Sequence, residues 1–155
     1  MRPLKLIACI ALPLAVGSIS GFATMDGMRG WYDTLNAPSF RPPSWVFGPV
    51  WTTLYVLMGI SLYRLLNAPP AEERTKAFLV FMLQLTLNFA WSFLFFMFHW
   101  LGIAFIEIVA MWLSILWMIR SLKKVDTTAA YLQIPYLLWV SFASILNGAY
   151  WWLNR

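Results

Sequence analysis

The chain has 155 residues, of which 61% are hydrophobic and only 11% are charged, and its mean hydropathy is +0.70. Soluble domains contain about 25% charged residues, so this composition is typical of a membrane protein without a soluble module. The net charge is +5, yet the basic residues form no stretch that would follow a nucleic-acid backbone. We therefore expect no nucleic-acid partner. Because Cys9 and His99 are the single cysteine and histidine, we also expect no internal disulfide and no metal cluster.

Five apolar runs are each long enough to cross a bilayer, which takes about 20 helical residues. We expect them at about residues 4–24, 45–66, 77–98, 103–122 and 129–153. The first run follows Arg2 and Lys5 and could be a signal peptide, but it continues far enough without polar interruption to span the membrane. The sequence therefore predicts an all-α integral membrane bundle of five transmembrane helices, a single domain over 1–155, with no internal repeat.

The basic residues predict the orientation of this bundle. Eight of the 11 fall on the side that holds the N-terminus: Arg2, Lys5, Arg64, Arg74, Lys76, Arg120, Lys123 and Lys124. Arg29, Arg41 and Arg155 fall on the other side. Basic loops stay in the cytoplasm, so we expect a cytoplasmic N-terminus in a bacterial cell membrane.

The stretch from Trp31 to Tyr55 is the most distinctive part of the sequence. It contains three tryptophans, Trp31, Trp45 and Trp51, and four prolines, Pro38, Pro42, Pro43 and Pro49. Proline fixes φ and removes an amide donor, so we expect a long, stiff, structured loop between the first two helices. The aromatic rings beside it offer flat apolar surface to a planar ligand. We expect this loop to cover a binding site.

Polar residues inside the apolar runs have two interpretations. Gln84, Asn88 and Trp91 share one helical face, and so do Tyr136, Trp139, Ala143, Asn147 and Tyr150. The amides and rings either line a pocket opposite Trp51 and Tyr55, or the amides join helices by hydrogen bonds worth about 0.6–2 kcal/mol each. The sequence leaves both interpretations open.

Glu107 and His99 also have two interpretations each. Glu107 is either a proton-coupling carboxylate or a residue near a helix end whose side chain reaches polar groups. His99 either ligates a haem iron or, beside Trp100, anchors a helix at the membrane interface. The sequence has no supported Ser/His/Asp set, no carboxylate pair and no phosphate-binding loop. Enzyme activity is therefore not indicated, and any chemistry would use Trp or Tyr rings beside a photoactive or redox-active ligand.

Several segments together closely resemble the translocator protein family, also called tryptophan-rich sensory proteins or peripheral benzodiazepine receptors. They are WYDTLNAPSFRPPSWVFGPVW with the following TTLYVLMG, QLTLNFAW at 84–91, PYLLW at 135–139, and the pair Leu146 and Asn147. The resemblance implies a five-helix membrane bundle, commonly a homodimer. Its pocket, beneath the loop, would bind porphyrins such as protoporphyrin IX or haem and synthetic benzodiazepine or isoquinoline ligands, with no obligatory cofactor.

The resemblance also implies roles for individual residues. The pocket would be lined by Tyr32, Pro42, Trp51, Asn88, Trp91, Trp139, Ala143 and Asn147. Trp51 and Trp139 match tryptophans implicated in light-dependent porphyrin breakdown, which makes them the candidate catalytic residues. A weak sterol (cholesterol) motif would comprise Leu146, Tyr150 and Arg155. Phe40 stands where many relatives have Trp.

These observations lead to one principal hypothesis and two alternatives. The principal hypothesis is a membrane receptor or sensor that binds porphyrins and regulates tetrapyrrole levels. The first alternative is an enzyme that degrades porphyrin with light and oxygen. The second is a transporter of porphyrin or sterol, against which the absence of a repeat argues.

Overall fold

The computed structural model describes residues 2–155, and every regular element in this range is helical. The elements are α1 (Pro3–Ala23), α2 (Met25–Arg29), α3 (Trp31–Thr34), the 3-10 helix η1 (Ser44–Val46), α4 (Phe47–Asn67), α5 (Glu72–Ser92), the π-helix η2 (Phe93–Met97), α6 (Leu101–Lys123), α7 (Thr127–Tyr131) and α8 (Ile134–Leu153). Five segments are long and apolar enough to cross a membrane: Pro3–Ala23, Ser44–Asn67, Glu72–Met97, Leu101–Lys123 and Thr127–Leu153. The predicted all-α bundle with five spans is confirmed.

Two of the five spans differ in detail from the prediction. The third begins at Glu72 rather than near residue 77, because Glu72 and Glu73 occupy a first helical turn, where negative charge is favourable. The fifth is interrupted between α7 and α8. Pro135 explains this break, since in a continuous helix its ring would clash with the carbonyl of Tyr131 and its nitrogen could not donate to that carbonyl.

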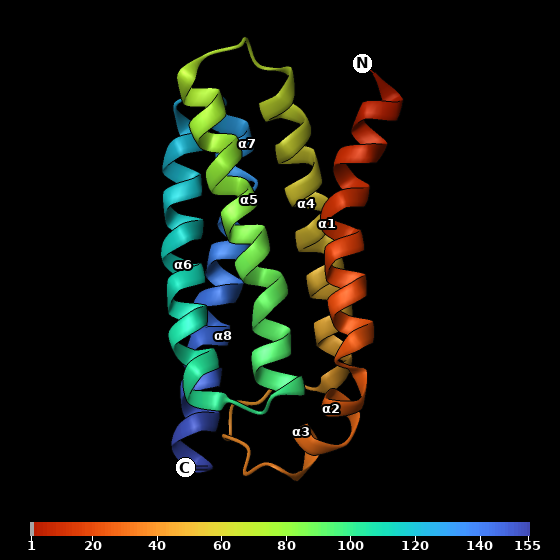
Figure 1. Cartoon of the computed structure of the whole chain (residues 1–155), viewed down its shortest axis with the longest axis vertical. Coiled ribbons are helices and arrows are strands. Elements are labelled where there is room, and N and C mark those ends of the chain that lie inside the picture. The colour runs from red at the N-terminus through yellow and green to blue at the C-terminus, as the bar shows by residue number, and fades with distance from the viewer. Residues whose placement is uncertain (1) are drawn as a thin grey trace.

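The long helices form a bundle in which α1 packs along α4, and α6 packs between α5 and α8 (Figure 1). The N-terminus and the α4–α5 connection lie at one end of the bundle, and the C-terminus lies at the other (Figure 1). The short helices α2 and α3 cross the C-terminal end. An odd number of spans requires this placement of the two termini.

The half of the bundle nearest the N-terminus is closely packed, and we call it the packed half. Its side chains with 0% exposure include Met58, Leu65, Ala77, Phe81, Met118, Leu122 and Ala129. Gly59 permits the close approach of α1 and α4, because a Cβ atom there would overlap the backbone of Ile10. Ser61 adds a buried link by donating from Oγ to the carbonyl of Ala129 at 2.9 Å.

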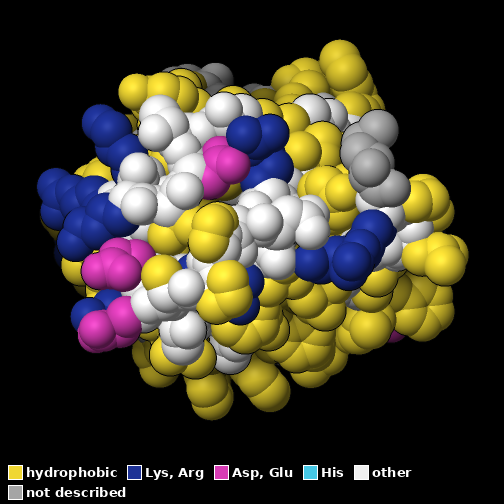
Figure 2. Space-filling view, turned by 90° about the horizontal axis from the view of Figure 1, so that it is seen from above, with side chains coloured by type: hydrophobic (Ala, Val, Ile, Leu, Met, Phe, Trp, Pro, Cys, Tyr) yellow, Lys and Arg dark blue, Asp and Glu magenta, His cyan; other side chains and the backbone are white. Residues whose placement is uncertain are grey.

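The eight basic residues expected on the N-terminal side all lie at the corresponding helix ends, and Figure 2 shows this face with its groups of Lys and Arg. Arg64 pairs with Asp126 at 2.9 Å, and Asp126 caps α7 by accepting from the amide of Ala129 at 2.8 Å. Burial alone would raise the pKa of Asp126, but the hydrogen bonds from Arg64 and Ala129 lower it below its ordinary value. The α6–α7 connection is thus held to α4.

The loop between α1 and α4 is structured by contacts at three places. Gly27 lies against the backbone of Phe96, where a side chain would not fit. The ring of Trp31 stacks on His99, with ring centroids 3.9 Å apart and an interplanar angle of 13°. At the C-terminal end of α8, Asn36 and Asn154 exchange two hydrogen bonds, of 2.9 and 3.0 Å. The prediction of a long structured loop is confirmed.

Candidate functional site: an aromatic cavity beneath the loop

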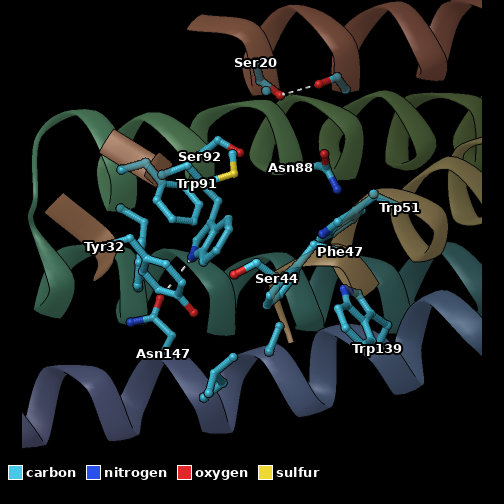
Figure 3. Close-up of a pocket in the computed structure, with 18 of the residues that line it drawn as sticks. Ser20, Tyr32, Ser44, Phe47, Trp51, Asn88, Trp91, Ser92, Trp139 and Asn147 are labelled. Carbon is cyan, nitrogen blue, oxygen red and sulfur yellow. Dashed lines mark hydrogen bonds between the residues drawn. The ribbon is translucent and has the colours of Figure 1, made fainter. Parts of the chain in front are cut away.

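A cavity of about 550 Å³ occupies the other half of the bundle, which we call the cavity half. Its walls come from α1, α4, α5, η2, α6 and α8, and its roof comes from α2 and α3. Aromatic side chains dominate the lining: Tyr32, Phe47, Trp51, Tyr55, Trp91, Phe95, Phe96, Trp139 and Tyr150. Figure 3 shows Trp51, Asn88, Trp91 and Trp139 converging on this space from three helices. Drug-sized ligands occupy pockets of roughly 300–1,000 Å³, so the volume suits a single small molecule.

Two indole rings form a corner in the wall of the cavity. Trp51 stacks on Tyr55, with centroids 5.6 Å apart and an interplanar angle of 27°. Trp139 stands at 90° to Trp51, with centroids 6.5 Å apart. The Nε1 atom of Trp139 is buried and has no hydrogen-bond partner among the described residues. The corner thus offers flat apolar faces and the buried, unpaired N–H donor of Trp139.

The two amides on the cavity wall also join helices. Tyr55 donates from its hydroxyl to Asn88 Oδ1 at 2.8 Å, and Asn88 Nδ2 donates to the hydroxyl of Tyr136 at 2.9 Å, which connects α4, α5 and α8. Trp91 Nε1 donates to Asn147 Oδ1 at 3.0 Å (Figure 3). Asn147 Nδ2 in turn donates to the carbonyl of Leu101, also at 3.0 Å. Both interpretations of the amides therefore hold in the geometry, since they line the cavity and bond between helices.

The end of the cavity beneath the loop is more polar. The rings of Tyr32 and Tyr150 lie 5.0 Å apart, and the guanidinium of Arg41 lies 4.4 Å from the centroid of the Tyr32 ring. Burial raises the pKa of Tyr32, so its hydroxyl stays protonated. Arg41 also pairs with Asp33 at 2.8 Å, and this hydrogen bond raises the pKa of Arg41. The charged residues among the lining are Arg29 and Asp33.

The structure brings together all but one of the eight residues that the resemblance assigned to the pocket. Those that line the cavity are Tyr32, Trp51, Asn88, Trp91, Trp139, Ala143 and Asn147. Pro42 does not line it, although Arg41 lies over the ring of Tyr32 and Ser44 borders the cavity. The role of these eight residues in ligand binding stays a prediction.

The three residues of the predicted sterol motif do not share one environment. Leu146 and Tyr150 are buried and line the cavity. Arg155 is exposed, and its guanidinium lies 3.3 Å from the centroid of the Trp152 ring. The three side chains therefore form no continuous surface, and the sterol motif stays a prediction.

Glu107 and His99 both lie outside the cavity lining. Both carboxylate oxygens of Glu107 are buried, and no described residue hydrogen-bonds to them, so the interpretation that this side chain reaches polar groups is not supported. His99 stacks on Trp31 with a positive φ of 60°. Among residues 2–155, no three His, Cys, Asp or Glu side chains lie close enough together to hold a metal ion.

Several lining residues were not anticipated from the sequence. Phe95 and Phe96 both face the interior because they lie in the wide turn of η2, and no sequence signal predicted a π-helix there.

Gly17 and Gly21 form a Gly-x-x-x-Gly pair whose two members differ. Gly17 fits against the ring of Tyr55, whereas a Cβ at Gly21 would meet nothing within 4 Å.

The fold and the cavity define a class of protein, a five-helix membrane bundle with a ligand-sized aromatic chamber. The model of the TspO/MBR family matches residues 9–153. The chain is 40% identical to the tryptophan-rich protein TspO of Archaeoglobus fulgidus over 99% of each chain. It is 35% identical to a tryptophan-rich sensory protein of Cereibacter sphaeroides (76% of this chain, 72% of the relative) and 34% identical to the translocator protein of Homo sapiens (85% and 79%). The chain therefore belongs to the TspO/MBR family and is an integral multi-pass membrane protein.

Proposed function

We propose that this protein is a membrane receptor or sensor that binds porphyrins, such as protoporphyrin IX or haem, in the aromatic cavity and thereby regulates tetrapyrrole levels. Membership of the TspO/MBR family supports the receptor or sensor role, since one relative is named a sensory protein and others are named translocator proteins. The observation that carries the proposal is the corner formed by Trp51 and Trp139 inside a chamber of about 550 Å³.

The physical basis of the proposed affinity is burial of a flat ring system. Apolar surface removed from water contributes about 25 cal/mol per Å², less the cost of ordering the partners. The indole of Trp51 is already held by its stack on Tyr55, and Tyr55 is held by its bond to Asn88. The rings that would contact a planar ligand are therefore already fixed in the free protein. Binding then costs little conformational entropy of these side chains.

The roof of the cavity gives the proposed receptor a means of response. Tyr32 and Met28 reach the cavity from α3 and α2, so a bound molecule would contact the loop as well as the helices. The contacts of Trp31 with His99 and of Asn36 with Asn154 then determine how far the roof can shift. In our proposal, the bound ligand contacts this already structured loop, and a shift of the roof against these contacts signals occupancy.

We further propose a bacterial cell membrane as the location, with the N-terminus in the cytoplasm and the loop facing out. The gathering of eight basic residues at the N-terminal end supports this orientation. A homodimer is proposed from the family resemblance. Large exposed apolar side chains such as Ile106 and Leu138 are in keeping with lipid or a second copy around the helices.

Titration with protoporphyrin IX tests the proposed function. We expect saturable quenching of Trp fluorescence and a shifted porphyrin absorbance band in the purified protein. The double variant Trp51→Phe with Trp139→Phe should weaken the affinity by about tenfold or more, because two buried aromatic contacts are reduced. Trp117→Phe is the matched control, since this exposed tryptophan lies outside the cavity. Equal affinities of the double variant and the wild type would refute the pocket assignment.

A light- and oxygen-dependent enzyme that degrades porphyrin is the second candidate function. The observation in its favour is the pair of indoles 6.5 Å apart in the wall, which would place two oxidisable rings beside one bound macrocycle. It predicts turnover of protoporphyrin IX under illumination that is lost in the same double variant. Bleaching at the same rate with denatured protein would leave only the photochemistry of the free porphyrin.

A further inference from the structure

The cavity changes in polarity from its inner end to the end beneath the loop. The inner end is bordered by apolar groups such as Leu14 and Met111, which lie in the middle of α1 and α6. The other end lies beneath the roof formed by α2 and α3, which contribute Arg29 and Asp33. A molecule that fills this space along its length would therefore place one edge among apolar side chains and the opposite edge beside charged groups.

The cations at this end of the bundle differ in their partners. Arg41 is paired with Asp33 at 2.8 Å, and Arg155 lies over the ring of Trp152. Arg29 lines the cavity and is exposed, and within residues 2–155 it has no ion pair and no side-chain hydrogen bond. Asp33, the other charged lining residue, already uses its carboxylate to accept from Arg41. The guanidinium of Arg29 is thus the available positive group at the end of the cavity beneath the roof.

A second donor lies at the same end. The side chain of Tyr150 is 0% exposed and lines the cavity, and its hydroxyl lies beside the Tyr32 side chain. Its ring lies beside that of Tyr32, which reaches into the cavity from the loop. The two tyrosines therefore place phenolic O–H donors in the cavity wall, within reach of an oxygen of a bound ligand.

We propose that the guanidinium of Arg29 binds a carboxylate of the ligand. The cavity would then select flat polycyclic acids over neutral polycyclic molecules of the same shape. A guanidinium presents paired N–H donors that match the two oxygens of a carboxylate. Because Arg29 is exposed, this contact is a surface charge pair, and its expected contribution to the binding free energy is modest. In the absence of ligand the exposed guanidinium is hydrated, so holding it ready requires no buried charge. This inference rests on the proposed function and deepens it by naming the chemical class of ligand.

Protoporphyrin IX and its dimethyl ester provide the test, because they share the macrocycle and differ in the two carboxylates. We expect the wild-type protein in nanodiscs to bind the diacid about three- to tenfold more tightly than the diester, measured by Trp fluorescence quenching. Arg29→Gln should remove this preference by weakening the diacid alone. Arg29→Lys should retain part of it, since the charge remains. Arg155→Gln is the matched control, because it removes a cation from the same end of the bundle but not from the cavity.

The outcomes separate this inference from the proposed function. Equal binding of diacid and diester by the wild type would overturn the inference but leave the cavity as a porphyrin site. An equal loss of both ligands in Arg29→Gln would also overturn it, since a folding defect or a changed loop affects both molecules alike. Binding of neither molecule by the wild type would overturn the proposed function itself. The preference should also shrink at high salt, because exposed charge pairs are screened.

Discussion

The two halves of the bundle use the same helices but fill space differently. In the packed half, side chains such as Met58 and Leu65 have 0% exposure, and Gly59 brings α1 onto α4. In the cavity half, large rings stand at steep angles to one another, as Trp51 and Trp139 do at 90°, and about 550 Å³ stays unfilled. Flexible aliphatic side chains can adapt to fill a gap, whereas rigid rings that meet edge to face cannot.

Hydrogen bonds that fix the aromatic rings also keep the cavity open. Tyr55 is held by Asn88, and Trp91 is held by Asn147. Each ring would otherwise be free to rotate into the empty space and gain packing contacts. The buried amides therefore oppose collapse of the cavity as well as joining the helices. The difference between the halves shows that a membrane bundle can separate a closely packed region from a region that holds a ligand-sized cavity.

Removing one phenyl ring from each half gives the largest expected difference. Phe81 is fully buried in the packed half, so Phe81→Ala leaves a new void and should cost about 3–5 kcal/mol of unfolding free energy. Phe47 is half-buried and already borders the cavity, so Phe47→Ala should cost only about 1–2 kcal/mol. Unfolding in detergent measures both. Equal losses would contradict the division of the bundle into two halves.

The same glycine substitution at two places on α4 sharpens the comparison. Gly59→Ala should destabilise the protein by about 1–3 kcal/mol, because the added methyl group meets the backbone of Ile10. Gly48→Ala, at the cavity end, should be neutral or stabilising by up to about 1 kcal/mol, since a Cβ there meets nothing within 4 Å and alanine favours the helix. A destabilisation of similar size at both positions would show that the cavity end is as tightly packed as the other.

The smallest effect is expected at the charged end of the packed half. Asp126→Asn removes the ion pair with Arg64 and should cost about 0.5 kcal/mol at neutral pH. The pKa of Asp126 is lowered by folding, so its contribution is complete above the ordinary aspartate value, about 4, and is lost as pH falls through the lowered value. Denaturation at several pH values measures the difference between variant and wild type. A difference that stays constant into strong acid would contradict this assignment.

The positions of the five spans were predictable because hydropathy over 20 residues depends little on tertiary contacts. Their ends were less predictable. The start of α5 at Glu72 depends on charge placement in one helical turn, and the break before α8 depends on the single residue Pro135. Such local effects change boundaries without changing the number of spans.

The site was predictable in part. The spacing of Asn88 and Trp91 and of Trp139 and Asn147 placed each pair on one face, and both faces reach the cavity. The tryptophans of the loop stretch could not be sorted in this way, because no helical period connects them. Trp51 lines the cavity, Trp31 stacks on His99, and Trp45 is 75% exposed. Pro42 shares this difficulty, since it lies in an irregular segment whose path depends on tertiary contacts.

The paired hydrogen bonds between Asn36 and Asn154 fasten the loop to the last residues beyond α8. The same helix carries Trp139 and Asn147 on the opposite side of the chamber. If α8 tilts, these hydrogen bonds make the loop that forms the roof move with it. The position of the roof over the cavity therefore depends on the tilt of α8. Removing the Asn36–Asn154 hydrogen bonds would let the roof and α8 move separately.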